Sequence, residues 1–193
     1  DGSAIELMSS SRNTLKNVEA RNNTSVGVLV QFSHNNSFIN SKFLFANDDN
    51  IYLCGSNGNL IENSTFLGRG FSTLGGGHEG IHVYEGSSFN IIRRNNIQFH
   101  NIAGIALNDF TNASSNGCTV GAVSSAPGMN NLIEYNIVTN NGINQSSIGG
   151  GGIEGIFLGG VDFTRVRNNL IRNNIGGGIT IAGGTFLGVP FSS

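Results

Sequence analysis

The sequence predicts an all-β solenoid, a parallel β-helix of about seven coils with 22–24 residues in each. The main observation is a phrase of four residues, in the order small or polar, aliphatic, variable, aliphatic, that recurs seven times. Its first aliphatic residue stands at positions 5, 28, 51, 81, 105, 156 and 179, so that four of the six intervals are 23 or 24 residues long. A fixed period of this size indicates stacked repeats that bury a continuous core between neighbouring coils.

A second apolar phrase, rich in Asn, stands between the copies of the first. Apolar alternation over only three to five residues favours short strands over helices. The chain contains 29 Asn and 29 Gly, which tolerate left-handed backbone angles and therefore suit the corners between short strands. The second phrases are Asn13–Val18, Asn36–Asn40, Asn59–Asn63, Asn90–Ile97, Asn131–Ile137 and Phe163–Leu170.

Each coil is expected to hold three short strands and three corners. Stacking pairs every strand in parallel with its equivalents in the coils above and below, about 4.8 Å away. The inward Ile, Leu, Val and Phe then form core columns, and Asn side chains at equivalent corners hydrogen-bond along the axis. The variable residues of the first phrase fall in one outer column, which reads Glu6, Leu29, Tyr52, His82, Ala106, Phe157 and Thr180.

The length and the breaks in the period set the domain organisation. A chain of 193 residues suits a single domain, 1–193. Three loop insertions are expected, near 66–77, 111–128 and 141–152, and they leave the strand phrases intact. Insertions in solenoids map to loops, often on one binding face.

The composition excludes some partners. A net charge of −2 with only 11% charged residues argues against a nucleic-acid partner, which needs a basic stripe. No apolar run approaches the length of a membrane span. The first residue is Asp and no signal peptide is visible, so we expect a mature or trimmed product.

The two cysteines bear on the cellular compartment. Cys54 is expected to point outward, two residues beyond Tyr52, and Cys118 lies in a Ser/Asn/Gly-rich insertion. They are either unrelated free thiols or a disulfide that ties the insertion to the coil wall, and we favour the disulfide. A disulfide would place the protein outside the cytosol, so we expect a secreted, extracellular protein.

Side chains that can do chemistry concentrate in the middle of the outer column. Asp48 and Asp49 precede the strand of Tyr52, and the corresponding acid one coil later is Glu79. Stacked coils would bring Asp49 near Glu79. Acids and histidines on one wall suit general acid–base work on a glycosidic bond, and paired carboxylates suit glycoside hydrolysis. The catalytic candidates are Asp48, Asp49, His78, Glu79 and His82.

Further side chains near this cluster are candidates for binding. Substrate-binding roles are assigned to Tyr52, Tyr84, Arg69 and Glu85. A close acidic pair could also hold calcium through oxygen ligands. We assign no metal site and expect no cofactor, and calcium is the one ion that the sequence leaves open.

The whole pattern resembles the right-handed parallel β-helix family, the pectin-lyase-like solenoids, over essentially all 193 residues. The resemblance implies a right-handed solenoid and a polysaccharide as partner. Asn47–Ile51 and Gly77–Ile81 in addition resemble the Asp-Asp and Gly-His-Gly motifs of the polygalacturonase-type glycoside hydrolases. That resemblance implies that Asp48 and Asp49 activate water and protonate the leaving oxygen, and that His78 supports them.

Two functions stay open at this point. The first is a secreted carbohydrate-active protein that cleaves or binds a polysaccharide, as a glycoside hydrolase or as a polysaccharide lyase with Tyr52, His82 and Arg69 as candidates. The second is a non-catalytic extracellular module, such as a filament subunit, adhesin or fibre segment, that assembles by end-to-end stacking of coils. The second is favoured by two missing motif partners, an acid at Ser25 and two cations within Ala106–Asn108.

Overall fold

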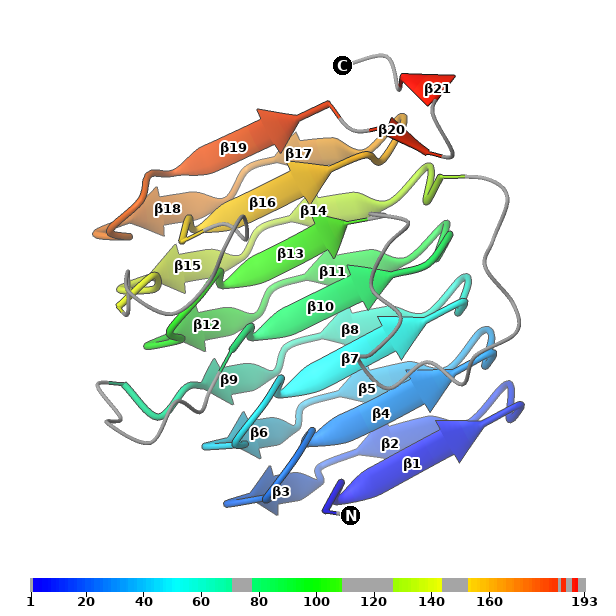
Figure 1. The fold of residues 1–193 in the computed structure, drawn as a ribbon. Coiled ribbons are helices and arrows are strands. Elements are labelled where there is room, and N and C mark those ends of the chain that lie inside the picture. The colour runs from blue at the N-terminus through cyan, green and yellow to red at the C-terminus, as the bar shows by residue number, and fades with distance from the viewer. Residues whose placement is uncertain are drawn as a thin grey trace.

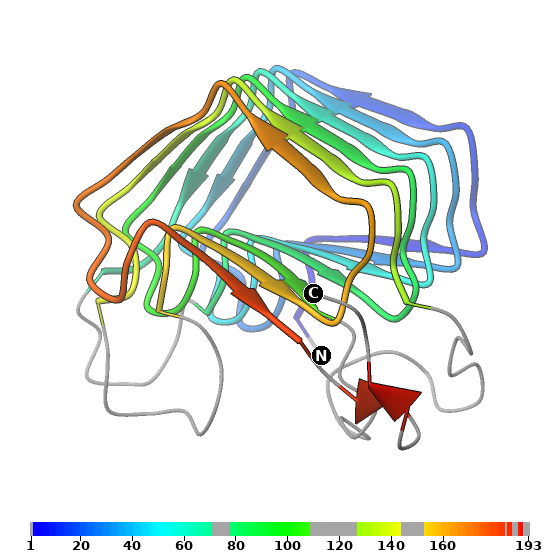
Figure 2. The same ribbon diagram turned by 90° about the horizontal axis from the view of Figure 1, so that it is seen from above.

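A computed structural model describes residues 2–70, 78–108, 127–143, 153–183, 185–186 and 189–190 of the chain. The described residues wind into a parallel β-helix, in which three flat sheets form the walls of a prism (Figures 1 and 2). The chain passes from sheet to sheet and returns to the first one coil higher. The prediction of a parallel β-helix with three strands in each coil is therefore confirmed.

The first sheet contains the recurring four-residue phrases. Its strands, in spatial order, are β1 (Ile5–Met8), β4 (Val28–Gln31), β7 (Ile51–Cys54), β10 (Ile81–Tyr84), β13 (Ile105–Asn108), β16 (Ile156–Gly159) and β19 (Ile179–Ala182).

The second and third sheets divide the Asn-rich phrases between them. The second sheet contains β2 (Thr14–Lys16), β5 (Ser37–Ile39), β8 (Leu60–Glu62), β11 (Ile91–Arg93), β14 (Leu132–Glu134) and β17 (Arg165–Arg167). The third contains β3 (Glu19–Arg21), β6 (Lys42–Leu44), β9 (Thr65–Leu67), β12 (Asn96–Gln98), β15 (Ile137–Thr139) and β18 (Leu170–Arg172). A short antiparallel pair, β20 (Thr185–Phe186) and β21 (Val189–Pro190), follows.

The core occupies the inside of the prism, because alternate residues of each strand point inward. In the second and third sheets the middle residue of each strand is the inward one, and Phe38, Phe43 and Phe66 are fully buried there. The rings of Phe43 and Phe66 stack between neighbouring coils with 5.1 Å between their centroids. Aromatic and β-branched side chains thus fill the continuous columns that the repeat predicts.

Polar ladders line the corners inside the prism. The amide groups of five asparagines form one such ladder, in which each Nδ2 donates to the Oδ1 of the next at 3.1–3.2 Å. Each Oδ1 also accepts a backbone N–H from the coil below, so that buried corner groups find partners. The predicted Asn ladder is confirmed, and its members are Asn13, Asn36, Asn59, Asn90 and Asn131.

The outer corners repeat a left-handed backbone conformation in each coil. Asn is the commonest residue there, as the composition predicts. Large aromatic residues also take positive φ, although this conformation costs roughly 1–2 kcal/mol for an ordinary L-residue. The aromatic residues with positive φ are Phe32, Phe45, Phe89, Phe99, Tyr135 and Phe163.

The insertions lie mostly outside the described residues. These gaps are 71–77, 109–126 and 144–152, within or beside the three expected insertions. The expected start of the first insertion was wrong, because Phe66 and Leu67 belong to β9 and Phe66 is fully buried in the core. The described residues contain no helix with the length and hydropathy needed to cross a membrane.

Candidate functional site

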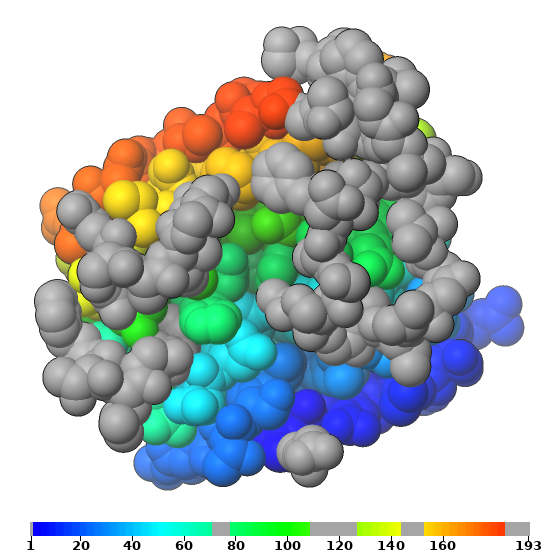
Figure 3. Space-filling model, viewed as in Figure 1, coloured from blue at the N-terminus to red at the C-terminus, as the bar shows by residue number. Residues whose placement is uncertain are grey.

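The candidate site lies on the outer face of the first sheet, where β7 and β10 run side by side, and this face is turned towards the viewer in Figures 1 and 3. The two strands pair in register, which sets Tyr52 opposite His82 and Cys54 opposite Tyr84. The corner before β7 carries Asp49, whose carboxylate reaches the corner before β10. The predicted neighbourhood of residues 52 and 82 is therefore confirmed.

The centre of the site is a hydrogen-bonded chain of three side chains. Asp49 Oδ2 lies 2.9 Å from Nδ1 of His82, and Nε2 of the same ring lies 2.7 Å from Oδ1 of Asn108. Both ring nitrogens thus face oxygen acceptors, an arrangement that suits the doubly protonated imidazolium. Burial lowers the pKa of His82, but the carboxylates of Asp49 and Glu79 outweigh it and raise the pKa to about 9.

Asp49 is held as an anion although it is buried. Its Oδ1 accepts the backbone N–H of Glu79 at 3.0 Å. Burial alone would raise the pKa of Asp49, but the charge and hydrogen bond of His82, together with hydrogen bonds from the side chain and backbone of Glu79, bring the pKa below its ordinary value. Asp49 and His82 therefore form a buried ion pair at neutral pH.

The pKa of Glu79 is shifted in the opposite direction from that of Asp49. Its side chain is buried, and burial together with the negative charge of Asp49 raises the pKa of Glu79 to about 8. At neutral pH the group is mostly a neutral acid that can donate a proton, and at mildly alkaline pH it becomes a carboxylate more basic than an ordinary glutamate. Two carboxyl groups with pKa values pushed apart are typical of acid–base sites.

A second pair of an aspartate and a histidine, Asp48 and His78, lies beside the pair of Asp49 and His82 and is more accessible to solvent. Asp48 Oδ1 lies 2.7 Å from Nδ1 of His78, and both side chains are about 40% exposed. The hydrogen bond to Asp48 is the main reason why the pKa of His78 rises to about 9. His78 therefore offers a cation that solvent can reach.

Aromatic rings complete the wall. The centroid of the Tyr52 ring lies 4.8 Å from that of His82 and 6.3 Å from that of Tyr84. Burial raises the pKa of Tyr52 well above its ordinary value, so that the phenol stays neutral. Both tyrosines are buried although they lie on the outer side of the sheet, whereas Glu6 at the corresponding position of β1 is exposed. The middle of the wall is thus a water-poor setting in which charges interact strongly.

Two other predicted residues lie next to the cluster. The guanidinium of Arg69 donates through Nε to the carbonyl oxygens of Phe45 and Ala46, at 2.9 and 3.3 Å, and so braces the corner before Asp48. Glu85 directly follows β10, and burial raises its pKa. Cys54 is fully buried, while its predicted partner Cys118 lies outside the described residues, so their disulfide stays a prediction.

Two groups that support the candidate site were not predicted from the sequence. Asn108, which accepts from His82, was noted only as a place where a family cation is missing. The register of β13 with β10 would have found it, because Asn108 pairs with Tyr84 on the same outer face.

The other missed group is a buried bridge at the corner between the third sheet and the first. Asn50, which follows Asp49, donates its amide to Nε2 of His100 at 3.2 Å, and Nδ1 of that ring lies 3.0 Å from Oδ1 of Asn141. Burial lowers the pKa of His100 to about 4, so the ring is neutral and accepts from Asn50. His100 takes a ladder position held by Asn in the next two coils, Asn141 and Asn174, and its greater length reaches Asn50 in the corner that carries Asp49.

The same carboxylates and histidines also form groups with metal-ligand spacing. One atom each from Asp48, Asp49 and His78 lie within 4.8 Å of one another, and the same holds for Asp49, Glu79 and His82. Calcium prefers six to eight oxygen ligands. Each group offers only two carboxylates and a nitrogen that already faces a carboxylate oxygen, so these residues fit calcium poorly.

Comparisons with solved structures show the same fold in two proteins of polysaccharide chemistry. The A-module of the Azotobacter vinelandii mannuronan C-5 epimerase AlgE4 superposes with a TM-score of 0.67 at 18% identity, over 90% of this chain and 44% of that one. The pectate lyase Pel9A superposes with a TM-score of 0.60 at 19% identity, over 84% of this chain and 40% of that one. The chain thus spans less than half the length of either protein.

A search of curated proteins found no match. The family model described as the right-handed β-helix region matches residues 1–120, which is more than half of the chain. Together with the three parallel sheets described above, this match shows that the chain belongs to the right-handed parallel β-helix family.

Proposed function

We propose that the chain acts on an acidic polysaccharide by moving the proton at C-5 of a uronate residue. The observation that carries the proposal is the buried group of Asp49, Glu79 and His82, in which one carboxyl group has a pKa of about 8 beside a fixed ion pair. This group stands in the middle of the first sheet, next to a half-exposed cation, His78.

The chemistry implied by the two structural relatives has a common first step. Inverting C-5 of a uronate and eliminating the oxygen at C-4 both begin with removal of the C-5 proton, which is acidified by the neighbouring carboxylate. A site for this step needs a base matched to the working pH and cations that offset the negative charge growing on the carboxylate. Glu79 and the two histidines supply these groups.

The roles of the residues follow from their charges. Glu79, when ionised, takes the C-5 proton. In an elimination the electron pair forms the C-4–C-5 double bond while the C-4–O bond breaks, and His78 gives a proton to the leaving oxygen. In an inversion the C-4–O bond stays intact, and His78 instead gives its proton to C-5 from the opposite face. His82, held by Asp49 and Asn108, cannot accept a proton and acts as a fixed positive charge.

Hydrolysis by two carboxylates fits the geometry less well. Inverting glycosidases separate their carboxyl groups by about 6.5–9.5 Å and retaining ones by about 5–5.5 Å. Oxygens of Asp49 and Glu79 approach within 4.8 Å, as do those of Asp48 and Asp49. The pair that the polygalacturonase resemblance singles out, Asp48 and Asp49, thus has its nearest carboxylate oxygens closer together than the separations typical of either class of glycosidase.

Hydrogen exchange at C-5 tests the proposal directly. We expect deuterium from heavy water to enter C-5 of polygalacturonate or alginate when either is incubated with the chain, with new ultraviolet-absorbing unsaturated ends if elimination follows. The rate should rise towards pH 8 as Glu79 ionises and fall above pH 9 as the histidines lose their charge.

Matched variants sharpen this test. Glu79→Gln should abolish the exchange, while Glu6→Gln, at the equivalent outer position of β1 to that of His82 in β10, should leave it unchanged. New reducing ends without exchange at C-5 would mean a hydrolase, and would overturn the proposal. Unaltered exchange in Glu79→Gln would remove the assignment of the base.

We also propose an extracellular location, because the expected substrate is a polysaccharide outside the cell. The pairing of Cys54 with Cys118 would support it, and peptide mapping by mass spectrometry without reduction would find or exclude that bond. Assembly into filaments by end-to-end stacking stays a prediction, which electron microscopy of the purified chain would check.

A further inference from the structure

We propose that the outer face of the second sheet is a separate, non-catalytic binding surface for a polyuronate chain. The surface covers β8, β11, β14 and β17, and lies on a different wall of the prism from the candidate site (Figure 2). We call it the arginine face, and its cations are Arg93, Arg94, Arg165 and Arg167.

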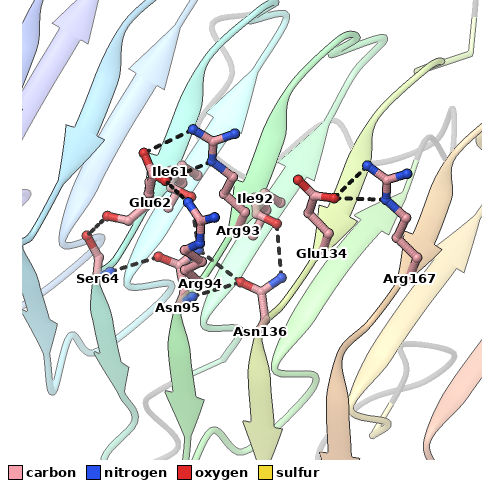
Figure 4. Close-up of polar contacts among 10 residues, drawn as sticks. All are labelled: Ile61, Glu62, Ser64, Ile92, Arg93, Arg94, Asn95, Glu134, Asn136 and Arg167. Carbon is pink, nitrogen blue, oxygen red and sulfur yellow. Dashed lines mark hydrogen bonds and ion pairs between the residues drawn. The ribbon is translucent and has the colours of Figure 1, made fainter.

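The acids on this face lie beneath the arginines. Figure 4 shows Glu62 between Arg93 and Arg94, and Glu134 bonded to Arg167. The side chains of the two glutamates are only 13% and 8% exposed, whereas those of Arg93, Arg94 and Arg167 are 33%, 56% and 57% exposed. Solvent therefore meets a layer of guanidinium groups, although the carboxylates partly balance the charge.

The buried acids also fix the arginines in place. Glu62 accepts Nε and Nη2 of Arg93 at 2.8 and 3.2 Å, and Nη1 of Arg94 at 2.9 Å. Arg94 in addition lies over the ring of Tyr135, 5.9 Å from its centroid. Each guanidinium carries five N–H donors, so these contacts leave donors for an outside anion. Arginines ordered in advance lose less conformational entropy on binding.

Exposed aromatic rings flank the arginines at both edges of the sheet. Phe89 and Phe163 stand at one corner column and Tyr135 at the other, and each is half exposed or more. All three have positive φ, of 59°, 51° and 56°. At the corner of Phe89 and Phe163 other coils place Asn35 and Asn130, which adopt this conformation more easily.

Strained and exposed rings are better explained by binding than by folding. Each ring pays a conformational cost at its corner and buries only part of its surface. Strain of this kind tends to persist where function requires it. An aromatic ring beside a cation is a common platform for the apolar face of a sugar.

The charge of the face selects the class of ligand. The chain as a whole has a net charge of −2, yet this face gathers four of its ten Lys and Arg residues against two shielded glutamates. Guanidinium groups bind carboxylates in a bidentate manner. A polymer with one carboxylate on each sugar ring matches both the arginines and the rings.

Binding of sodium polygalacturonate to the full chain tests this inference, with the fully methyl-esterified polymer as a neutral control. We expect wild type to bind the charged polymer more tightly, with an affinity that falls as salt is added. The double variant Phe89→Asn, Phe163→Asn should bind about tenfold more weakly while its melting temperature stays the same or rises, because Asn accepts the left-handed corner. Arg165→Gln should also weaken binding, and Arg172→Gln, an exposed arginine of β18 on the third sheet, should not.

Any of three binding results would overturn the inference: wild-type affinity in both sets of variants, equal binding of the esterified polymer, or an equal loss in Arg172→Gln. A fall in melting temperature of the double variant that accounts for its weaker binding would do the same, because the rings would then be structural. These results are distinct from failure of the proposed function. Absence of C-5 exchange with weakened binding in the variants would sink only the catalytic proposal, and exchange with unchanged binding would sink only this one.

Discussion

Replacement of Glu79 by Gln should change how the stability of the protein depends on pH. Gln has nearly the same shape as Glu and cannot ionise, so the variant keeps the packing of the site and removes one titration. Glu79 is buried beside the anion of Asp49, and its pKa rises from the ordinary 4.5 to about 8. The folded protein therefore keeps this proton over a range of pH in which the unfolded chain has lost it.

The sign and size of the effect follow from proton linkage. Between pH 5 and pH 8 the folded state binds more protons at Glu79 than the unfolded state does, so the free energy of unfolding falls as pH rises. Each unit of pH in this window changes that free energy by about 1.4 kcal/mol. Over three units, wild type should lose about 4 kcal/mol relative to Glu79→Gln.

Urea unfolding followed by circular dichroism at pH 5, 6.5 and 8 measures this difference. The gap between the two proteins should widen steadily in favour of the variant as the pH rises. Glu6→Gln serves as the control, because Glu6 occupies the corresponding strand of the first coil and is exposed. A gap that stays constant with pH would show that Glu79 is ionised in the folded protein below pH 5, and would refute both the magnitude and the role of Glu79 as a base with raised pKa.

Three further changes test other parts of the argument. Asp49→Asn leaves the buried His82 without its counter-ion. We therefore expect the free energy of unfolding in urea to fall by about 3–5 kcal/mol and C-5 exchange to stop. Full exchange in this variant would contradict the role of Asp49. His100→Asn loses the hydrogen bond from Asn50 and should cost about 1 kcal/mol and slow the exchange, whereas unchanged turnover would show that the bridge does not position the corner. Phe38→Ala opens a cavity beneath the second sheet, on another wall of the prism, and should cost about 3–5 kcal/mol while activity per folded molecule stays constant.

The fold could be predicted because its signal is repeated in each coil. The aliphatic pair Ile51 and Leu53 recurs as Ile81 and Val83 with the same inward direction, and an insertion between coils does not alter the alternation within a strand. The same regularity predicts that Tyr52 lies opposite His82. Because the coils are equal units stacked in register, the position of a residue in its repeat determines which residues of the next coil lie beside it.

The chemistry of the site was less accessible to sequence reasoning. The raised pKa of Glu79 depends on its burial, and residues on the outer side of a sheet are normally expected to be exposed. Asn108 could be placed on the right face, but its contact with His82 depends on the side-chain conformations. The start of the first insertion was misjudged because Phe66 belongs to the third strand of its coil, where the polar residues around it obscure the strand pattern.

In the sheets of the described coils, hydrogen bonds and packing link each coil mainly to its two immediate neighbours. Whole turns of chain can therefore be gained or lost by duplication or deletion at a distance from β7 and β10 while the reacting groups keep their positions. The reach of the protein along a polymer would then grow in steps of about 4.8 Å. Under the proposed function, the number of sugars held would then change independently of the reaction carried out on one of them.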